Sequence, residues 1–191
     1  NWDDIKDLNV NNGDPDNPES MHLGRFIDAL AIAREYGKML YVDVKTGRGD
    51  LIVAAIQSDS YYKEALVREE IDGLLPMLAL DTDLLVMPPV ENTEQFDSIY
   101  AQVTPPIVEI ALVASNAELG AYINSSGVKI QQDVMVAGDT KAVFSNDYSG
   151  WKDFIDAGVV LLQTDAPQLL VPAVKQYNES GIFPESGPED E

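Results

Sequence analysis

Apolar residues follow two alternating patterns along the chain, a helical spacing and short continuous runs. In 23–31 they are spaced as on one face of a helix, and Gly37 follows as a stop. The next run, Met39–Val44, is short, apolar and rich in strand-forming residues. A helical spacing returns over 151–155, and Gly158 again precedes an apolar run. The pattern therefore predicts helices that alternate with short strands.

Strands that alternate with helices are typical of a parallel sheet whose connections cross over through the helices. The predicted strands are apolar at nearly every position, as expected where both faces of a sheet are buried. A doubly wound sheet and a (β/α) barrel both remain open on periodicity alone. No G-x-G-x-x-G follows a strand, so a dinucleotide site is not indicated. The predicted strands are Met39–Val44, Ala65–Val67, Leu84–Met87, Ile107–Val113, Val128–Val136 and Val159–Gln163.

Polar residues at the ends of these segments predict how some helices begin. Asn92 with Gln95 three residues later has the spacing of a capping box. Asp165 is expected to cap the last helix, with Pro167 in its first turn. The segment from Gly181 onward is acidic and contains proline, so it is expected to be disordered.

Composition restricts the chemistry. The 191 residues include 33 Asp and Glu against 12 Lys and Arg, a net charge of −21. A chain this acidic repels nucleic acid, which we exclude as a partner, and attracts cations. It contains no cysteine and one histidine, His22. Disulfides, thiolate chemistry and a site built from two histidines of this chain are therefore excluded.

Several stretches resemble one enzyme family. Met39–Lys45, "MLYVDVK", resembles the third strand of the glycerophosphodiester phosphodiesterases. Gly150–Leu170, "GWKDFIDAGVVLLQTDAPQLL", resembles that family's ending, with a helix, the last strand and Thr-Asp-x-Pro. "LLVMPPV" and "IVEIAL" resemble middle strands, and "WDDIKDL" resembles the helix after the second strand. The resemblance covers Trp2 to about Tyr177.

The resemblance implies an α/β fold, a TIM-type (β/α) barrel that lacks its first two βα units. The barrel domain would cover 1–180, and 181–191 would be an acidic tail. The family hydrolyses glycerophosphodiesters to an alcohol and glycerol 3-phosphate with a carboxylate-bound divalent metal and two histidines. By resemblance, Asp43 would be a metal ligand and Lys45 would meet the phosphate as a catalytic residue. Strand side chains alternate, so both lie on one face.

The family's His-Arg-Gly, Glu-x-Asp and second histidine belong to its first two strands and do not occur in this chain. The isolated chain is therefore expected to be inactive, and to hold calcium or magnesium only if the missing segment is supplied. Glu109 and Asp133 are further pocket candidates. Glu109 could instead be a buried carboxylate paired with a base such as Lys129, and Asp133 a loop residue. Without the resemblance, Asp43 and Lys45 would be interpreted as a polar strand end.

Other function classes remain open beside the hydrolase. The partner would be a glycerophosphodiester or another phosphate-containing small molecule, bound with or without turnover. The alternative is a non-catalytic assembly module, because a barrel remnant exposes sheet edges that recruit strands by self-association or from a complementing segment. Two N-glycosylation sequons begin at Asn124 and Asn178 and are compatible with an extracellular or periplasmic location.

Overall fold

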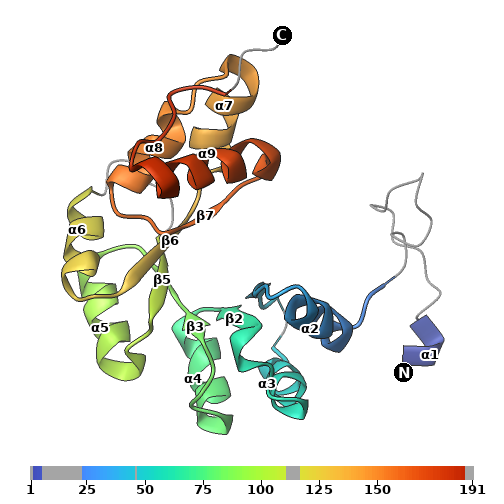
Figure 1. Cartoon of the computed structure of the whole chain (residues 1–191). Coiled ribbons are helices and arrows are strands. Elements are labelled where there is room, and N and C mark those ends of the chain that lie inside the picture. The colour runs from blue at the N-terminus through green and yellow to red at the C-terminus, as the bar shows by residue number, and fades with distance from the viewer. Residues whose placement is uncertain (1, 6–22, 46, 111–116, 188–191) are drawn as a thin grey trace. The chain divides into compact units, whose positions relative to one another are not determined.

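A computed structural model describes residues 2–5, 23–45, 47–110 and 117–187 (Figure 1). Its contacts divide the chain into two compact units. The first comprises Asn1–Arg68 and Asp72–Leu85, and the second comprises Glu69–Ile71 and Val86–Glu191. Strands and helices alternate in both units, as the hydrophobic pattern predicts. No helix among the described residues is long and apolar enough to cross a membrane.

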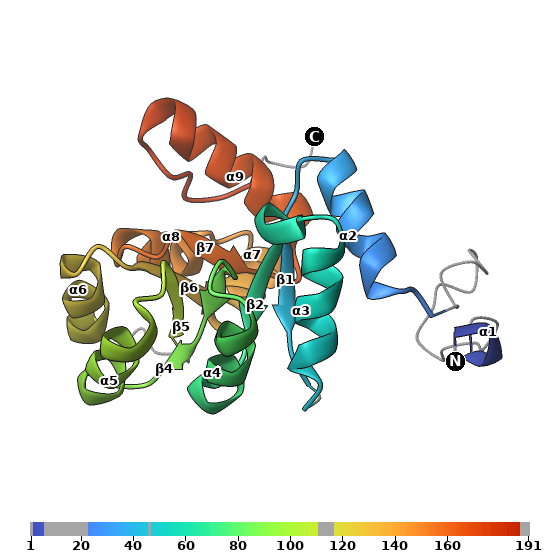
Figure 2. The ribbon, with the colours of Figure 1, turned by 90° about the horizontal axis from the view of Figure 1, so that it is seen from below.

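The first unit contains a parallel strand pair with helices packed beside it. Strand β1 pairs with β2 in a register that places Leu40 opposite Ala65 and Asp43 opposite Arg68. Helices α2 and α3 lie side by side in both views (Figures 1 and 2). The elements are α1 (Trp2–Ile5), α2 (Phe26–Glu35), β1 (Leu40–Asp43), α3 (Gly49–Ser58), the 3-10 turn η2 (Tyr61–Lys63), β2 (Ala65–Arg68) and α4 (Ile71–Leu80).

The second unit contains a sheet of the order β4-β5-β6-β7, in which all neighbouring strands are parallel. Helices α5 and α6 lie next to each other beside this sheet (Figure 2). The elements are β3 (Val86–Met87), β4 (Pro89–Val90), α5 (Thr93–Val103), β5 (Ile107–Ile110), α6 (Ala117–Ser125), β6 (Lys129–Asp133), the π-helical turn η3 (Met135–Asp139), α7 (Thr140–Ser145), α8 (Ser149–Asp156), β7 (Leu161–Gln163) and α9 (Pro167–Ser180).

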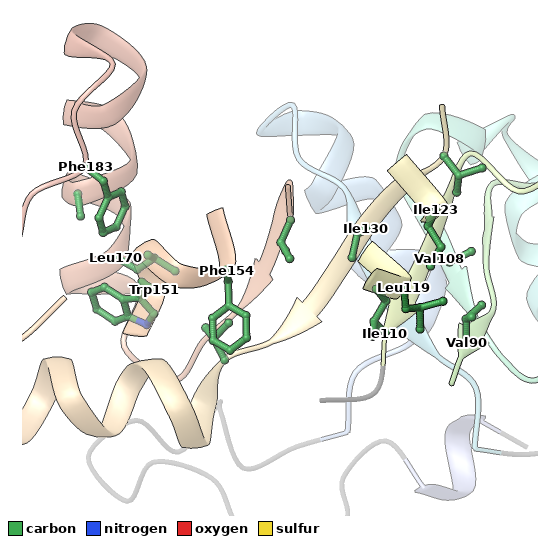
Figure 3. Packing of buried hydrophobic residues seen from close by; sticks show 14 of the residues in the cluster. Val90, Val108, Ile110, Leu119, Ile123, Ile130, Trp151, Phe154, Leu170 and Phe183 are labelled. Carbon is green, nitrogen blue, oxygen red and sulfur yellow. The ribbon is translucent and has the colours of Figure 1, made fainter. Parts of the chain in front are cut away.

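One apolar cluster joins the sheet of the second unit to its helices (Figure 3). Ile130 of β6 is fully buried, and a Cβ added at Gly120 of α6 would lie 3.9 Å from its Cδ1. Helix α6 therefore packs on the face of the sheet to which Ile130 belongs. Trp151 and Phe154 of α8 extend the same cluster towards Leu170 of α9. Burial of such side chains is the main source of stability for this unit.

Several predicted helix boundaries are confirmed. The Asn92 side chain accepts a hydrogen bond from the Gln95 amide at 2.9 Å, and Gln95 Oε1 accepts one from the Glu91 amide at 2.8 Å. The predicted capping box therefore forms, although the Gln95 side chain binds the amide of Glu91 rather than that of the N-cap residue Asn92. Gly37 and Gly158 adopt left-handed φ values of 59° and 88°, which a residue with a Cβ adopts at a cost.

The prediction that Asp165 caps the last helix is wrong. The N-cap of α9 is Ala166, which makes no side-chain capping bond. Instead, Thr164 Oγ1 accepts a hydrogen bond from the Ala166 amide at 2.9 Å. The hydroxyl of Thr164 thus takes the local role expected of the Asp165 carboxylate.

The strand predicted over 128–136 ends earlier, at Asp133. The Asp133 carboxylate accepts a hydrogen bond from the Met135 amide at 2.8 Å, a local turn that takes the backbone out of the sheet. The apolar residues that follow begin η3 and α7, which the sequence did not predict.

The segment after Gly181 is ordered as far as residue 187, so the prediction of disorder is wrong for 181–187. Phe183 is only 4% exposed, and its ring lies 6.1 Å from that of Tyr177. The Gly187 amide donates to Asn146 Oδ1 at 2.8 Å. The buried Phe183 ring and the backbone hydrogen bonds hold this segment in place despite its polar composition. Residues 188–191 lie outside the described residues, and the domain boundary expected at 180 stays a prediction.

Candidate functional site

Asp43 and Lys45 lie at the carboxyl edge of the strand pair in the first unit. Asp43 is the last residue of β1, and Lys45 follows two residues later, beyond the strand. Arg68 ends β2 and stands opposite Asp43 in the parallel register. Carboxyl ends of parallel strands are where α/β folds carry their sites. The chain thus brings one acidic and two basic side chains to that edge.

The two basic side chains lie on either side of the Asp43 carboxylate. Lys45 Nζ is 2.6 Å from Asp43 Oδ2, and Arg68 Nη1 is 4.0 Å from Asp43 Oδ1. The Lys45 side chain is 74% exposed, whereas that of Arg68 is 21% exposed. An exposed ammonium retains most of its hydration, so its bond to Asp43 is weak and exchangeable. Lys45 is therefore available to an anionic ligand.

A hollow of about 380 Å³ opens beside this pair. Its charged members are Asp43 and Lys45, and the rest of its wall is apolar. A phosphate on the charged side would leave room for a small organic group against the apolar side. The hollow is lined by Phe26, Asp43, Val44, Lys45, Leu51, Ile52 and Ala55.

The residues around Asp43 do not fit a divalent metal. Calcium takes six to eight oxygen ligands, and magnesium takes six. Among the described residues, no group of three or more His, Asp or Glu side chains is placed to hold an ion. Two cations, those of Lys45 and Arg68, lie within 4.0 Å of the Asp43 carboxylate and oppose a metal. The arrangement suits an anion better than a metal.

Glu109 and Asp133 belong to the second unit, where they share one face of its sheet. Glu109 of β5 stands opposite Gln131 of β6, and Asp133 stands opposite Gln163 of β7. Gln131 Nε2 donates to Gln163 Oε1 at 3.5 Å. Side chains two residues apart on a strand point the same way, so these residues form a polar row. This polar row points to the opposite face of the sheet from Ile130, which packs against α6.

Two buried glutamines of β6, Gln131 and Gln132, are not among the residues that the sequence pointed to as candidates for a site. Gln131 is 1% exposed and Gln132 is 3% exposed. Gln131 Oε1 and Gln132 Nε2 have no hydrogen-bond partner in the part of the chain that the structure describes. Buried amides without a full set of partners are costly. Two consecutive glutamines within a predicted apolar strand are the sequence feature that could have pointed to these residues.

Asp139 is a buried acidic residue that sequence reasoning missed altogether. Its carboxylate accepts hydrogen bonds from Trp151 Nε1 at 2.8 Å and from Thr164 Oγ1 at 2.8 Å. The Asp165 amide donates to it at 2.6 Å. These bonds tie η3 to α8 and to the loop after β7. Because the carboxylate is buried and fully engaged, Asp139 is a bracing residue rather than a ligand-binding one.

The bracing requires a close approach at Gly138, the residue before Asp139. A Cβ added there would lie 2.2 Å from Trp151 Cδ1, far inside van der Waals contact. Trp151 lies in the stretch quoted for the family resemblance, but nothing in the sequence around Gly138 and Asp139 indicates that they approach it. His22, the single histidine, lies outside the described residues.

Comparisons with known proteins give matches in structure alone. No family model and no curated protein matches the sequence. Among solved structures, a glycerophosphoryl diester phosphodiesterase from Parabacteroides distasonis aligns with a TM-score of 0.69 and 14% identity. A second enzyme of that organism gives 0.67 and 13%, and one from Agrobacterium tumefaciens gives 0.66 and 12%.

The alignments cover most of this chain and a smaller part of the others. They include 98%, 94% and 87% of this chain, but only 65%, 72% and 69% of the respective solved chains. At this identity the similarity is one of fold. It agrees with the resemblance given by Met39–Lys45 and Gly150–Leu170. The chain has the fold of the glycerophosphodiester phosphodiesterases, over about two thirds of their length.

Proposed function

We propose that this chain is the larger part of a glycerophosphodiester phosphodiesterase and that the Asp43–Lys45 edge binds the phosphate of the substrate. In this proposal the parallel strands belong to an incomplete TIM-type (β/α) barrel that lacks its first two βα units. The observation that carries the proposal is the exposed Lys45 ammonium at the carboxyl edge of β1, with Arg68 on the other side of Asp43. The fold of the solved enzymes supports it.

Each residue at this edge has a proposed role. Lys45 supplies a point charge to the phosphate oxygens. Arg68 keeps a second positive charge close by and is largely shielded from water, with its side chain 21% exposed. Asp43 holds the Lys45 ammonium in place when no substrate is bound. In the overall reaction, water adds to phosphorus and one phosphorus–oxygen bond breaks, which releases an alcohol and glycerol 3-phosphate.

By resemblance, two histidines would move the protons in this reaction, one as acid and one as base. This chain has one histidine and cannot supply that pair by itself. We therefore propose that the isolated chain binds phosphate-containing ligands but hydrolyses glycerophosphodiesters negligibly. Calcium or magnesium would be held firmly beside Asp43 only with further carboxylates from a complementing segment, because one carboxylate alone binds such an ion poorly. Glu109 and Asp133 are proposed to line the pocket of the complete protein.

Ligand binding and turnover test the two halves of the proposal separately. Titration calorimetry with glycerol 3-phosphate should give weak, saturable binding to the isolated chain. The Lys45→Met variant should bind about tenfold more weakly, because one charge-assisted contact is lost. Lys175→Met removes another exposed lysine, from α9, and should leave the affinity unchanged. Equal affinity of the Lys45 variant and the unaltered chain would refute the assignment of this edge.

Turnover is measured as glycerol 3-phosphate released from glycerophosphocholine, with calcium or magnesium present. We expect no release above the rate without protein. Release that disappears in the Asp43→Asn variant would contradict the proposal that the isolated chain is inactive. It would leave the proposed phosphate site intact.

A further inference from the structure

The hollow beside Asp43 and Lys45 has a wall with two unlike parts. One part carries these two charged side chains, from the end of β1. The other part is hydrocarbon and comes largely from helices α2 and α3, which lie side by side (Figure 2). Among the described residues, no uncharged hydrogen-bonding side chain lines the hollow. Its apolar members are Phe26, Val44, Leu51, Ile52 and Ala55.

Helix α3 has more apolar surface than its packing in the first unit uses. Val53 and Ile56 are each 1% exposed and form its buried face. Leu51, Ile52 and Ala55 are three or four residues apart and form a second stripe, which lines the hollow. Leu51 is 56% exposed in this stripe. A helix that only covers a core needs one apolar face, so the second stripe indicates a ligand with an apolar part.

The charged residues that flank this wall in the sequence are paired with each other. Arg25, next to Phe26, donates two hydrogen bonds to the Asp28 carboxylate, at 2.7 and 2.6 Å. Arg48 donates two to the Asp50 carboxylate, both at 2.9 Å. Each carboxylate thus already has a two-point partner, the geometry that guanidinium groups favour. Asp28 and Asp50 therefore add little recognition of ligand hydroxyl groups.

An apolar alcohol fits this wall better than a polyhydric one. Hydrocarbon that the wall covers leaves water, which is favourable in proportion to the covered area. A hydroxyl group in the same place gives up its bonds to water and gains no side-chain partner from the wall. A hollow of about 380 Å³ has room for a phosphate together with a short chain.

We propose that the phosphodiester bound at this edge has an apolar alcohol on one side of its phosphate, and that the α2–α3 wall covers this alcohol. The class of alcohol rests on the proposed function, because it requires the phosphate to bind at Lys45. The chain of the alcohol lies along Leu51 and Ile52 while the phosphate contacts the Lys45 ammonium. The other ester group faces away from the wall and can be glycerol.

The test compares phosphate monoesters by titration calorimetry with the full chain. Methyl, ethyl, propyl and butyl phosphate differ only in chain length, and we expect the affinity to rise about threefold with each added methylene. Propyl phosphate and glycerol 3-phosphate form a matched pair that differs by two hydroxyl groups. We expect propyl phosphate to bind about tenfold more tightly, because its chain loses no hydrogen bonds to water.

Two leucine variants locate this preference on the structure. Leu51→Asn makes the wall polar and should reduce the advantage of propyl phosphate to about twofold or less, without weakening methyl phosphate. Leu80→Asn is the matched control, because Leu80 of α4 is 58% exposed and does not line the hollow. It should keep the full advantage of propyl phosphate. Circular dichroism and retained binding of methyl phosphate report that both variants are folded.

The possible failures are distinguishable. Equal affinity for propyl phosphate and glycerol 3-phosphate, with both weakened by Lys45→Met, would overturn the apolar alcohol and leave the phosphate site intact. An advantage of propyl phosphate that survives Leu51→Asn would show that the α3 stripe does not cover the chain. A rise with chain length that Lys45→Met does not lower would mean apolar adsorption away from the phosphate edge. Absence of binding by every monoester at about 10 mM would refute the proposed phosphate site as well.

Discussion

Lys45 Nζ lies 2.6 Å from Asp43 Oδ2. The family resemblance assigns Lys45 to the phosphate and Asp43 to a metal, but here the Lys45 ammonium occupies the position beside Asp43 that a metal ion would need. The two assignments exclude each other while this contact lasts. A ligand phosphate draws Lys45 away from Asp43, whereas a metal has to displace it. The contact is exposed and therefore weak, so either exchange is cheap in free energy.

This competition predicts that removal of Lys45 improves cation binding at Asp43. A single carboxylate binds calcium poorly, but the Lys45→Met variant should bind it about five- to tenfold less weakly at this position than the unaltered chain, because about 1 kcal/mol of charge repulsion is removed. Calcium titration calorimetry measures the change. The double variant with Asp43→Asn should lose the gain, which separates the site from diffuse binding to the acidic surface. Identical calcium binding by the single variant and the unaltered chain would contradict the competition.

Asp139 and Trp151 are expected to stabilise the second unit together. Asp139→Ala leaves the buried indole amine without its acceptor and removes the bonds to Thr164 and Asp165. We expect a loss of roughly 2–4 kcal/mol in the free energy of unfolding, since more than one buried donor loses its partner. Urea unfolding followed by tryptophan fluorescence measures it.

A double-mutant cycle with Trp151→Phe isolates the bond between the two side chains. Phenylalanine keeps a large ring in the core but has no N–H to donate. If the bond is formed as described, the two substitutions cost less together than the sum of their separate effects. Strict additivity would mean that the Asp139–Trp151 bond contributes nothing to stability.

The elements of the fold were largely predictable because the hydrophobic pattern is local. Apolar runs correspond to strands, although the burial expected on both faces holds for β2 and not for β1, which is half-buried on one face and exposed on the other. The exceptions come from contacts that no local pattern reveals. Strand β6 ends at Asp133 because its carboxylate binds the Met135 amide, although the apolar residues continue. The short strand β4, at Pro89–Val90, forms only through its pairing with β5.

The candidate site was predictable only in part, for a related reason. The alternation of side chains along β1 predicted that Asp43 and Lys45 lie near each other, and they are in contact. Arg68 is distant in sequence and reaches Asp43 through the register of β1 with β2, which the sequence does not reveal. The Asp139 brace depends likewise on a close approach between segments, for which Gly138 leaves room.

Two neighbouring residues of the C-terminal segment should differ sharply in their effect on stability. Phe183 is 4% exposed and packs near Tyr177, whereas Ile182 is 70% exposed. Phe183→Ala should lower the free energy of unfolding by roughly 3–5 kcal/mol, the usual cost of deleting a buried aromatic side chain. Ile182→Ala should change it by about 0.5 kcal/mol or less. Comparable effects of both substitutions in urea unfolding would show that the segment is not anchored by Phe183.

Acid should weaken the first unit through Asp81, the first residue after α4. Tyr62 Oη donates to its carboxylate at 2.6 Å, Gln57 Nε2 at 2.7 Å and the Asp83 amide at 2.9 Å. The hydrogen bond from Tyr62, followed by those from Asp83 and Gln57, lowers the pKa of Asp81 below its ordinary value. A carboxyl whose pKa is lower in the folded chain stabilises the fold above its unfolded pKa of about 3.9. That contribution is lost as the pH falls through the lower, folded pKa.

The Asp81→Asn variant should therefore melt at a lower temperature than the unaltered chain at pH 7. The two melting temperatures should converge as the pH falls below about 4, where the carboxylate becomes protonated in the unaltered chain. Tyr62→Phe removes the largest cause of the lowered pKa, so its melting temperature should depend less steeply on pH in the same range. Thermal unfolding followed by circular dichroism between neutral and acidic pH measures all three proteins. A difference between Asp81→Asn and the unaltered chain that stays constant down to acidic pH would mean that the charge of Asp81 is not what stabilises this contact.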